Sequence, residues 1–369
     1  MRTTETLIVG GGLSGLYAAH LLQQQGKDYR LLESRTGWGG RIASATVSGG
    51  IHNHRFDLGP TWFWPDFQTQ LAQRIDELGL EVFAQHEAGD TVIERSLDGL
   101  PARVRGYPSS PVSMRVVGGM TALVDAIRQG CDPQRLIMGQ TVHRLVQEGT
   151  QVEVHAQDGH GESSVYRADR VLLAIPPRLA IHRIHFTPEL PPGLLQAWRN
   201  TPTWMAPHSK YLAVYDTPFW REQGLSGQAR SAVGPMVEIH DASAPGGPAA
   251  LFGFLGLSAP HRSRMSEETL KAHCRAQLER LFGHQAGQPS HEFLKDWAQD
   301  PDTATPADAN AAGHHGTAPP SHPAEGPWAH RIWGVASEWS PQFSGYVAGA
   351  IEAATLGVQA LGVTSEAAR

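Results

Sequence analysis

Residues 5–34 read ETLIVGGGLSGLYAAHLLQQQGKDYRLLES and carry the strongest indication of the chain's architecture. A short apolar run, residues 7–9, stops at glycines and is followed by apolar residues at helical spacing. A second apolar run then ends at Glu33. We therefore predict a strand, a helix and a second strand, which together open an α/β domain.

The glycines of this stretch form a pattern that is typical of dinucleotide binding. Gly10, Gly12 and Gly15 are spaced as GxGxxG, which permits a tight turn, close approach of a pyrophosphate and tight helix packing. The helix N-terminus then directs its partial positive charge at the phosphates. Glu33 follows Gly15 by eighteen residues, where an acid accepts hydrogen bonds from ribose hydroxyls. We predict dinucleotide binding; the alternative is a glycine-rich turn in an ordinary α/β domain.

The residues after Glu33 distinguish between NAD and FAD. The stretch ESRTGWGGRI, residues 33–42, adds Arg35, a second glycine pair at Gly39 and Gly40, and Arg41. A second Gly-Gly-Arg close behind the ribose acid is similar to the signature of the flavin amine oxidase superfamily, in which it lies along the FAD pyrophosphate. FAD is therefore favoured, with a surface turn and an exposed arginine as the alternative.

The resemblance to flavin amine oxidases continues along nearly the whole chain. Five further segments match in order: FDLGPTWFWPDFQTQL (56–71), VVGGMTALVDAI (116–127), TVHRLVQEGTQVEVHAQDG (141–159), ADRVLLAIPPRLAIHRIHFTPELPPGLLQAW (168–198) and RIWGVASEWSPQFSGYVAGAIEAATLGVQAL (331–361). The third segment also predicts paired strands over 141–146 and 151–156 from its alternating residues. Five ordered segments are far more specific than any single motif.

The resemblance implies an α/β protein with a Rossmann-type FAD-binding domain, interleaved with an α+β substrate domain whose sheet is flanked by helices. Residues 1–66, 114–202 and 329–369 are expected to form the FAD domain, and residues 67–113 and 203–328 the substrate domain. The first substrate segment is shorter than in the longer family members. Residues 300–327 are rich in Ala, Pro, His and Gly and are expected to form a long irregular loop.

The cofactor implied by the resemblance is FAD, bound without a covalent bond. Neither the cysteine that bonds the flavin in mitochondrial monoamine oxidases nor the cage tyrosine that follows it has a counterpart between residues 297 and 345. The residues expected to bind FAD are Gly10, Gly12, Leu13, Ser14, Gly15, Glu33, Ser34, Arg35, Gly39, Gly40, Arg41, Gly59, Pro60, Thr61, Trp62, Val142, Glu338, Ser344, Gly345, Tyr346 and Ala348. Val142 matches the residue that meets the adenine.

An aromatic substrate pocket is expected from Trp62, Trp64 and Tyr346. Tyr346 matches the other cage tyrosine of the family, and an aromatic face beside the flavin can guide an amine. Ordinary core packing is the alternative for all three side chains, since the chain contains ten tryptophans.

Lys210 stands at the head of HSKYLAVYDTPFW, residues 208–220, a run that otherwise reads as a buried strand. Burying an ammonium is costly, so the simple interpretation is a lysine at the edge of the sheet that reaches water. The resemblance gives another. Lys210 precedes Phe219 by nine residues, which is the spacing of the family's flavin-facing lysine, and it is then expected to assist catalysis together with Tyr346.

The activity implied by the resemblance is amine oxidation. The amine's α-carbon delivers a hydride to flavin N5, O2 reoxidises the flavin and gives H2O2, and the imine hydrolyses to an aldehyde. No general base is required, because the cofactor performs the difficult step. Two alternatives stay open: an FAD enzyme that desaturates or isomerises a carbon skeleton, and a flavin-binding regulatory module without turnover. The sequence indicates neither the particular amine nor an oligomeric state.

Composition excludes several other classes. The formal charge is -6, without a basic block suited to nucleic acid. Cys131 and Cys274 lie far apart and outside any metal-ligand spacing, so neither a disulfide framework nor a metal site is expected. His314 and His315 are read as ordinary loop histidines rather than as a site of flavin attachment, metal binding or catalysis. With no signal peptide and no apolar run of membrane-spanning length, we expect a soluble, cytoplasmic protein.

Overall fold

The predicted strand, helix and strand open the computed structural model, which describes residues 2–49, 52–309 and 317–366. β1 (Arg2–Val9) leads through the glycine turn into α1 (Leu13–Gln24), and β2 (Tyr29–Leu32) then pairs with β1 in parallel. α1 ends where Gly26 adopts a positive φ of 66° and Lys27 N–H donates to Leu22 O at 3.0 Å. This left-handed residue closes the helix, because glycine carries no Cβ that would oppose it.

The first sheet has eight strands, in the order β13-β10-β11-β12-β1-β2-β9, with β19 paired to β12. Its remaining strands are β9 (Leu136–Ile137), β10 (Thr141–Glu148), β11 (Gln151–Gln157), β12 (Ser163–Leu173), β13 (His185–Thr187) and β19 (Ile332–Gly334). β10 and β11 pair antiparallel, as the alternation predicted. β12 runs parallel to β1, and β19 runs parallel to β12. The carboxyl ends of these three strands therefore lie at one edge of the sheet.

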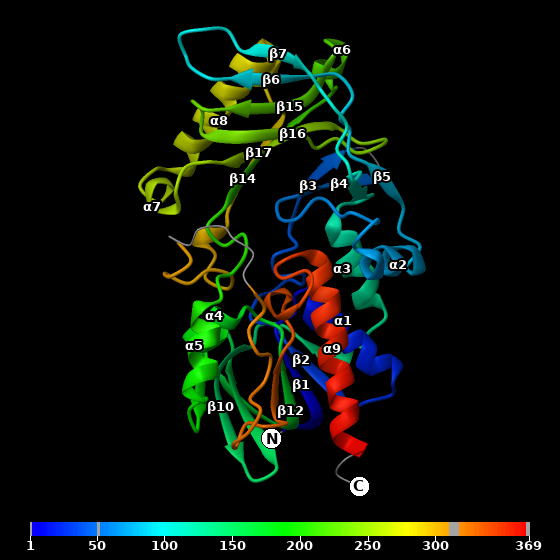
Figure 1. Cartoon of the computed structure of the whole chain (residues 1–369), viewed down its shortest axis with the longest axis vertical. Helices are drawn as coiled ribbons and strands as arrows, with labels where there is room; N and C mark the ends of the chain where they lie inside the picture. The colour runs from blue at the N-terminus through cyan, green and yellow to red at the C-terminus, as the bar shows by residue number, and fades with distance from the viewer. Residues whose placement is uncertain (1, 50–51, 310–316, 367–369) are drawn as a thin grey trace.

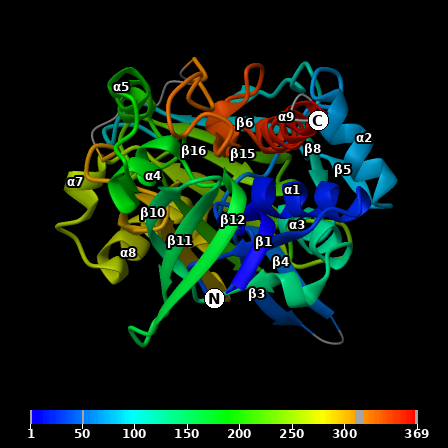
Figure 2. The ribbon, with the colours of Figure 1, turned by 90° about the horizontal axis from the view of Figure 1, so that it is seen from below.

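Helices cover this first sheet. They are α2 (Thr69–Glu77), α3 (Met120–Gln129), α4 (Pro177–Arg183), α5 (Pro192–Asn200) and α9 (Val347–Glu366), together with α1. α1, α3 and α9 share one apolar cluster that includes Leu16, Ile127 and Ile351, whereas Trp198 of α5 belongs to another. Figure 2 shows these two groups of helices on different sides of the sheet. The α/β class and the Rossmann-type unit are therefore confirmed.

The second sheet has seven strands, in the order β18-β14-β17-β16-β15-β6-β7. They are β6 (Asp90–Glu94), β7 (Ala102–Arg105), β14 (Ser209–Tyr215), β15 (Leu225–Ser231), β16 (Met236–Asp241), β17 (Ala249–Leu255) and β18 (His291–Asp296). α6 (Phe219–Glu222), α7 (Ala259–Arg262) and α8 (Glu267–Phe282) accompany them. α8 packs Leu270, Leu278 and Phe282 on one face of this sheet, at roughly 1.5–3 kcal/mol for each buried side chain.

The two sheets lie at opposite ends of the long axis (Figure 1), joined by two small sheets. These pair β3 (Ser44–Gly49) with β4 (His52–Asp57), and β5 (Val82–Ala84) with β8 (Met114–Val116). Strands of the second sheet come from residues 90–105 and 209–296, which fall in the two segments assigned to the substrate domain. The domain boundaries themselves stay predictions. Residues 300–309 and 317–331 contain no helix or strand, in line with the expected irregular loop.

Candidate cofactor and substrate site

One cavity of about 760 Å³ begins at the carboxyl edge of the parallel strands and reaches the second sheet. Gly10, Glu33, Ala174 and Ala336 line it, and each closely follows a strand of the first sheet. Open α/β folds bind ligands at this edge. The predicted residues that line the cavity are Gly10, Gly12, Leu13, Ser14, Glu33, Ser34, Arg35, Gly39, Gly40, Arg41, Gly59, Pro60, Thr61, Trp62, Trp64, Val142, Gly345 and Tyr346.

The glycine turn is shaped for close approach. Gly10 adopts a φ of 107°, and a Cβ added to Gly15 would lie 1.9 Å from Gly10 O. Gly15 therefore serves the packing of α1 against the turn and does not line the cavity. The first turn of α1 contains no acidic residue and its N-cap, Gly12, provides no side-chain cap. The positive end of the helix is thus left for a phosphate.

Glu33 is held at the cavity wall by the backbone of both glycine-rich turns. Its carboxylate accepts hydrogen bonds from Gly11 N–H at 2.5 Å and from Arg35 N–H at 2.9 Å, and the residue is 5% exposed. Gln140 N–H donates to Glu33 O at 2.8 Å, which brings the neighbouring Val142 to the same end of the cavity. The predicted ribose acid and adenine contact therefore lie together.

Arg35 has a different set of contacts from the one expected for a cofactor ligand. Its guanidinium donates to Asp300 Oδ1 at 2.6 Å, to Thr303 Oγ1 at 3.3 Å and to Gly40 O at 3.1 Å. Lys295 Nζ also donates to Asp300, at 2.6 Å. Arg35 lines the cavity, but its charge fixes the irregular segment 300–303 over the second glycine turn.

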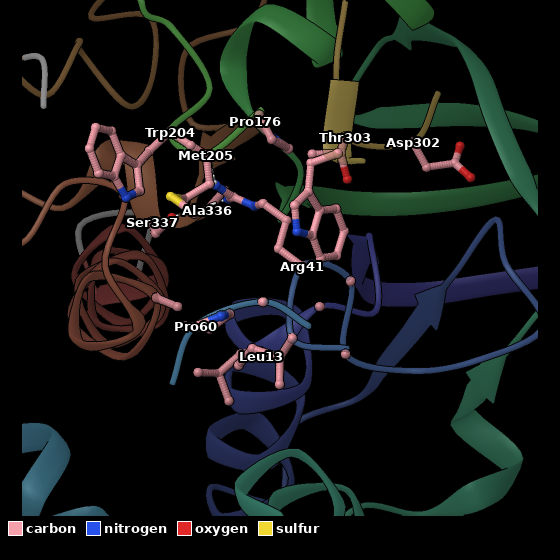
Figure 3. Close-up of a pocket in the computed structure, with 18 of the residues that line it drawn as sticks. Leu13, Arg41, Pro60, Pro176, Trp204, Met205, Asp302, Thr303, Ala336 and Ser337 are labelled. Atoms are coloured by element: carbon pink, nitrogen blue, oxygen red, sulfur yellow. Dashed lines mark hydrogen bonds between the residues drawn. The ribbon is translucent and has the colours of Figure 1, made fainter. Parts of the chain in front are cut away.

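Arg41 crosses the cavity and pairs with Glu338. Its Nη1 and Nη2 donate to Glu338 Oε1 at 2.5 Å and Oε2 at 2.9 Å, and Glu338 is 1% exposed. In Figure 3 the Arg41 side chain extends toward Trp204 and Ser337, above Leu13. A bidentate pair of this kind is charge-assisted and directional.

Three other predicted cofactor residues act from behind the cavity wall. Glu338 reaches the cavity through Arg41, Ser344 Oγ donates to Glu338 O at 3.2 Å, and Ala348 is buried in the cluster of α1 and α9. None of the three lines the cavity, so their predicted role becomes one of positioning.

Lys210 is fully enclosed, and the interpretation of an edge lysine that reaches water is wrong. β14 lies between β17 and β18, and Lys210 is 2% exposed. Its ammonium donates to Thr61 Oγ1 at 2.6 Å and Gly59 O at 3.2 Å, and lies 3.9 Å from the Phe252 ring centroid. Gly59 and Thr61 line the cavity, so Lys210 contacts its wall from the outer side.

Two further buried charges influence Lys210. Burial lowers the pKa of Lys210 to about 7, although the carboxylate of Asp57 acts in the opposite direction. Burial raises the pKa of Asp57, which accepts from Met120 N–H at the start of α3 at 2.8 Å. Arg115 donates to Ser243 O and Ala242 O and adds a second positive charge. The charge of Lys210 is thus sensitive to pH and to any anion placed beside it.

The three predicted aromatic residues line the cavity and two of them contact each other. Trp64 and Tyr346 meet edge to face, with ring centroids 6.3 Å apart. Trp64 Nε1 donates to Ser113 and Trp62 Nε1 to Gln85 Oε1 at 2.8 Å, so both indoles have fixed orientations. Trp62 also contacts Phe254 of the second sheet, at 6.5 Å between centroids. These contacts form two aromatic pairs, Trp64 with Tyr346 and Trp62 with Phe254, which together make an aromatic wall of the cavity.

The crossing segment between the two sheets also lines the cavity, and sequence reasoning missed it. It includes Trp204, Met205, Pro207 and His208. Met205 has a φ of 67°, which is uncommon for a residue with a side chain and points to a constrained turn. Burial and then the nearby Arg262 lower the pKa of His208, which favours a neutral imidazole.

Other missed residues come from the second sheet and the segment after it. They are Val237, Glu238, Phe254, Leu255, Leu257, Arg262, Trp297, Asp302 and Thr303. No pattern in the sequence marked these residues: Arg262 is buried and pairs with Asp296, but only the folded structure shows that pairing. Val237, Glu238, Phe254 and Leu255 are ordinary strand residues, and the remaining ones lie in short helices or connecting segments. Only tertiary packing brings them to the cavity.

The cavity fits a flavin dinucleotide. It combines a bare helix N-terminus, a cation at Arg41, an acid at Glu33 and an aromatic end, which correspond to pyrophosphate, ribose and ring. Among the described residues no cluster of His, Cys, Asp or Glu could hold a metal ion, and no described helix is long and apolar enough to cross a membrane. His314 and His315 lie outside the described residues.

Comparison with protein-family models gives two matches. Residues 110–361, more than half of the chain, match the model described as flavin containing amine oxidoreductase. Residues 8–78 match an NAD(P)-binding Rossmann-like domain, which covers both glycine turns.

Individual relatives agree with these models. The chain is 24% identical to a probable flavin-containing monoamine oxidase A of Dictyostelium discoideum, over 94% of this chain and 95% of that protein. It is 25% identical to the putrescine oxidase of Kocuria rosea, over 72% and 78%. Among solved structures, a redesigned putrescine oxidase superposes with a TM-score of 0.81 at 21% identity, over 98% and 99% of the two chains. Cyclohexylamine oxidase from Brevibacterium oxydans gives 0.77 at 19% identity, over the same shares.

Proposed function

Because this chain belongs to the flavin-containing amine oxidoreductase family, we propose that it oxidises an amine at its α-carbon with O2 as the electron acceptor. The chain is thus an FAD-dependent oxidoreductase, and the resemblance read from its sequence is confirmed. The particular reaction rests on one observation: a single cavity joins the dinucleotide groove to an aromatic wall.

FAD, which the first glycine turn, Glu33 and Arg41 would hold, would serve as the electron acceptor: the α C–H bond of the amine would break and its hydrogen would leave with both electrons toward flavin N5. The remaining imine takes up water and releases an aldehyde and ammonia or a smaller amine. O2 then takes up two electrons and two protons to give H2O2.

The protein's contribution is to orient the amine and to accept it without its proton. Trp62, Trp64 and Tyr346 surround the substrate end with apolar faces, so a charged ammonium loses hydration there and its neutral form is favoured. Fixed indoles hold the amine in a reactive position. No side chain needs to act as a general base.

Lys210 is proposed to assist the reaction with O2. Its ammonium lies directly behind Gly59 and Thr61, where a positive charge stabilises the negative charge that develops as oxygen is reduced. Because Gly59 and Thr61 separate Lys210 from the substrate, the ammonium is proposed to act on the reaction with O2 electrostatically, across these two residues.

The test is anaerobic addition of amines to the purified yellow protein. We expect primary, secondary or polyamine substrates to bleach the oxidised flavin absorbance, and subsequent O2 to restore it with one H2O2 per amine. If no amine in such a screen bleaches the flavin while a hydrocarbon substrate does, the enzyme is a desaturase or isomerase. If nothing bleaches it, the regulatory alternative gains support.

FAD is proposed to be bound without a covalent link, because the segment before the last flavin-binding strand lacks a cysteine. Acid precipitation is then expected to release all yellow colour into the supernatant. Colour that stays in the pellet contradicts this and makes His314 and His315 the residues to replace first.

A further inference from the structure

Three residues with contrasting chemistry form one row across the second sheet. Lys210 of β14 lies opposite Phe254 of β17, and Glu238 of β16 lies opposite the same Phe254. Adjacent strands are about 4.8 Å apart, so the backbones of Lys210 and Glu238 are separated by about 10 Å. The row therefore reads cation, aromatic ring and anion.

The row lies on the face of the sheet that borders the cavity. Phe252 and Leu212, which occupy the next row with His240, pack in the cluster that contains Trp62. Ile239, whose side chain points the other way, packs in the cluster of α8. Phe254 and Glu238 both line the cavity, whereas Lys210 is separated from it by the Gly59 to Thr61 segment.

Glu238 is only partly neutralised by its neighbours. His240 Nε2 lies 2.7 Å from Oε1, and Arg230 donates to both carboxylate oxygens at 3.4 Å. The Arg230 side chain is 65% exposed, and a long, solvated pair of this kind contributes little. The hydrogen bond with His240 lowers the pKa of Glu238, so the group is an anion at neutral pH.

The surroundings of Glu238 in the cavity are largely apolar. At the substrate end the cavity is also lined by four apolar side chains: Trp62, Phe254, Leu255 and Leu257. The other carboxylates that line the described cavity are Glu33 and Asp302, and both belong to the dinucleotide end. A substrate with only methylene groups at this point would displace water from the carboxylate without forming a hydrogen bond to it, which costs binding free energy.

We propose that Glu238 binds a second cationic group of the substrate, so that the enzyme prefers diamines or polyamines to monoamines of equal length. This inference rests on the proposed amine oxidation. One nitrogen enters the aromatic end without its proton and is oxidised, while the distal ammonium remains charged and pairs with Glu238. An aliphatic diamine suits this arrangement, because its methylene groups would lie against the apolar side chains of Phe254 and Leu255 while its two nitrogens reach the two polar points.

The test compares matched substrates. We expect the wild-type kcat/KM for 1,4-diaminobutane or 1,5-diaminopentane to exceed that for butylamine or pentylamine at least tenfold. Glu238→Gln keeps the size and one acceptor, and is expected to lower kcat/KM for the diamines by about 10- to 100-fold while the monoamines change less than about twofold. Glu189→Gln, at an exposed position, controls for net charge and is expected to change neither value.

Equilibrium binding gives a readout that does not depend on turnover. Enzyme reduced with dithionite under argon cannot oxidise an amine, and calorimetry with 1,4-diaminobutane then reports its Kd. Glu238→Gln is expected to raise this Kd about 10- to 100-fold, and Arg230→Gln, which removes a competing cation, is expected to leave it unchanged or lower it.

The outcomes separate the two proposals. Equal wild-type efficiency with diamines and monoamines, or a parallel loss for both in Glu238→Gln, overturns the role of Glu238 but leaves amine oxidation intact. Absence of flavin bleaching by every amine overturns the proposed function instead. Tight binding of the diamine to reduced Glu238→Gln enzyme overturns the inference in either case.

Discussion

Arg41 and Lys210 both bring a cation to the cavity, but their surroundings differ. Arg41 forms a two-point ion pair with Glu338. Lys210 has a carbonyl, a hydroxyl and the faces of Phe252 and Phe254 beside it, and no carboxylate of the described residues forms an ion pair with its ammonium. One cation is therefore matched by an anion at contact distance, whereas the other is held by neutral groups.

This difference has a chemical meaning. The two-point pair with Glu338 fixes the direction of the Arg41 guanidinium, which suits a residue that must face a pyrophosphate. Neutral acceptors leave the charge of Lys210 dependent on pH, with its pKa lowered by burial to about 7. Such a group can respond to charge that appears nearby during a reaction cycle.

The largest expected effect comes from breaking the matched pair. Glu338→Gln leaves Arg41 without its anion inside the protein, and we expect the free energy of unfolding to fall by about 3 kcal/mol. Urea denaturation of the purified proteins measures it. Glu325→Gln, at an exposed position, is the control and is expected to change stability by less than about 0.5 kcal/mol. Equal stability of Glu338→Gln and wild type means that Arg41 is satisfied by water.

The unmatched cation is expected to affect rate rather than stability. Lys210→Met keeps the apolar stem and removes a buried charge, so FAD should be retained and stability should change by less than about 1 kcal/mol. Reoxidation of photoreduced enzyme by O2 is expected to slow about 100-fold, or about 2.7 kcal/mol of barrier. Stopped-flow mixing with oxygenated buffer measures this rate. Reoxidation at the wild-type rate with intact amine turnover removes Lys210 from the mechanism.

The carboxylate of Glu33, at the dinucleotide end of the cavity, is expected to affect the binding of FAD. Glu33→Ala removes the carboxylate that faces the expected ribose, and we expect the Kd of FAD to rise about 10- to 30-fold. Flavin fluorescence after reconstitution of the apoprotein gives this Kd. Because Glu33 also accepts from Gly11 and Arg35, far-UV circular dichroism of the apoprotein serves as the folding control. An unchanged Kd in a folded variant assigns the ribose contact elsewhere.

The pH dependence of the rate of reoxidation by O2 is expected to show the smallest effect, and it distinguishes the charged from the neutral form of Lys210. Lys210 assists only while protonated, so wild-type reoxidation is expected to be fast below its pKa and to slow about tenfold as pH rises through it. The inflection is expected above pH 7, because anionic reduced flavin raises the pKa from its flavin-free value of about 7. Lys210→Met is expected to give a flat profile. Asp57→Asn removes an opposing negative charge and should move the inflection lower; an unmoved inflection excludes Asp57 as its partner.

The dinucleotide end was predictable because its chemistry is local in sequence. Gly10, Gly12, Glu33 and Arg41 fall within 32 residues, and backbone rules for tight turns dictate their spacing. Trp62, Trp64 and Tyr346 were found through the family resemblance, although the edge-to-face contact of Trp64 with Tyr346 was not foreseeable.

The substrate end was less accessible to sequence reasoning. Glu238 and Phe254 read as ordinary members of alternating strands, and only the register of β16, β17 and β14 places them in a row with Lys210. Arg35 matched the family's cofactor pattern, but its partners Asp300 and Thr303 lie more than 260 residues away and redirect its charge. Pairings over such distances depend on tertiary packing, which a local pattern does not encode.

Arg35 joins the second glycine turn to residues 300–303, which are synthesised more than 260 residues later. This late contact indicates when the cavity can form during biosynthesis. The walls of the flavin cavity come from residues as early as Val9 and as late as Ala350, and β1 receives its parallel neighbour β12 only after residue 173. A nascent chain therefore displays the glycine turn long before any pocket exists around it. We therefore expect the cofactor to be captured only after the segment that contains Ala350 has been made, and a ribosome-bound fragment that stops before residue 330 is expected to be colourless.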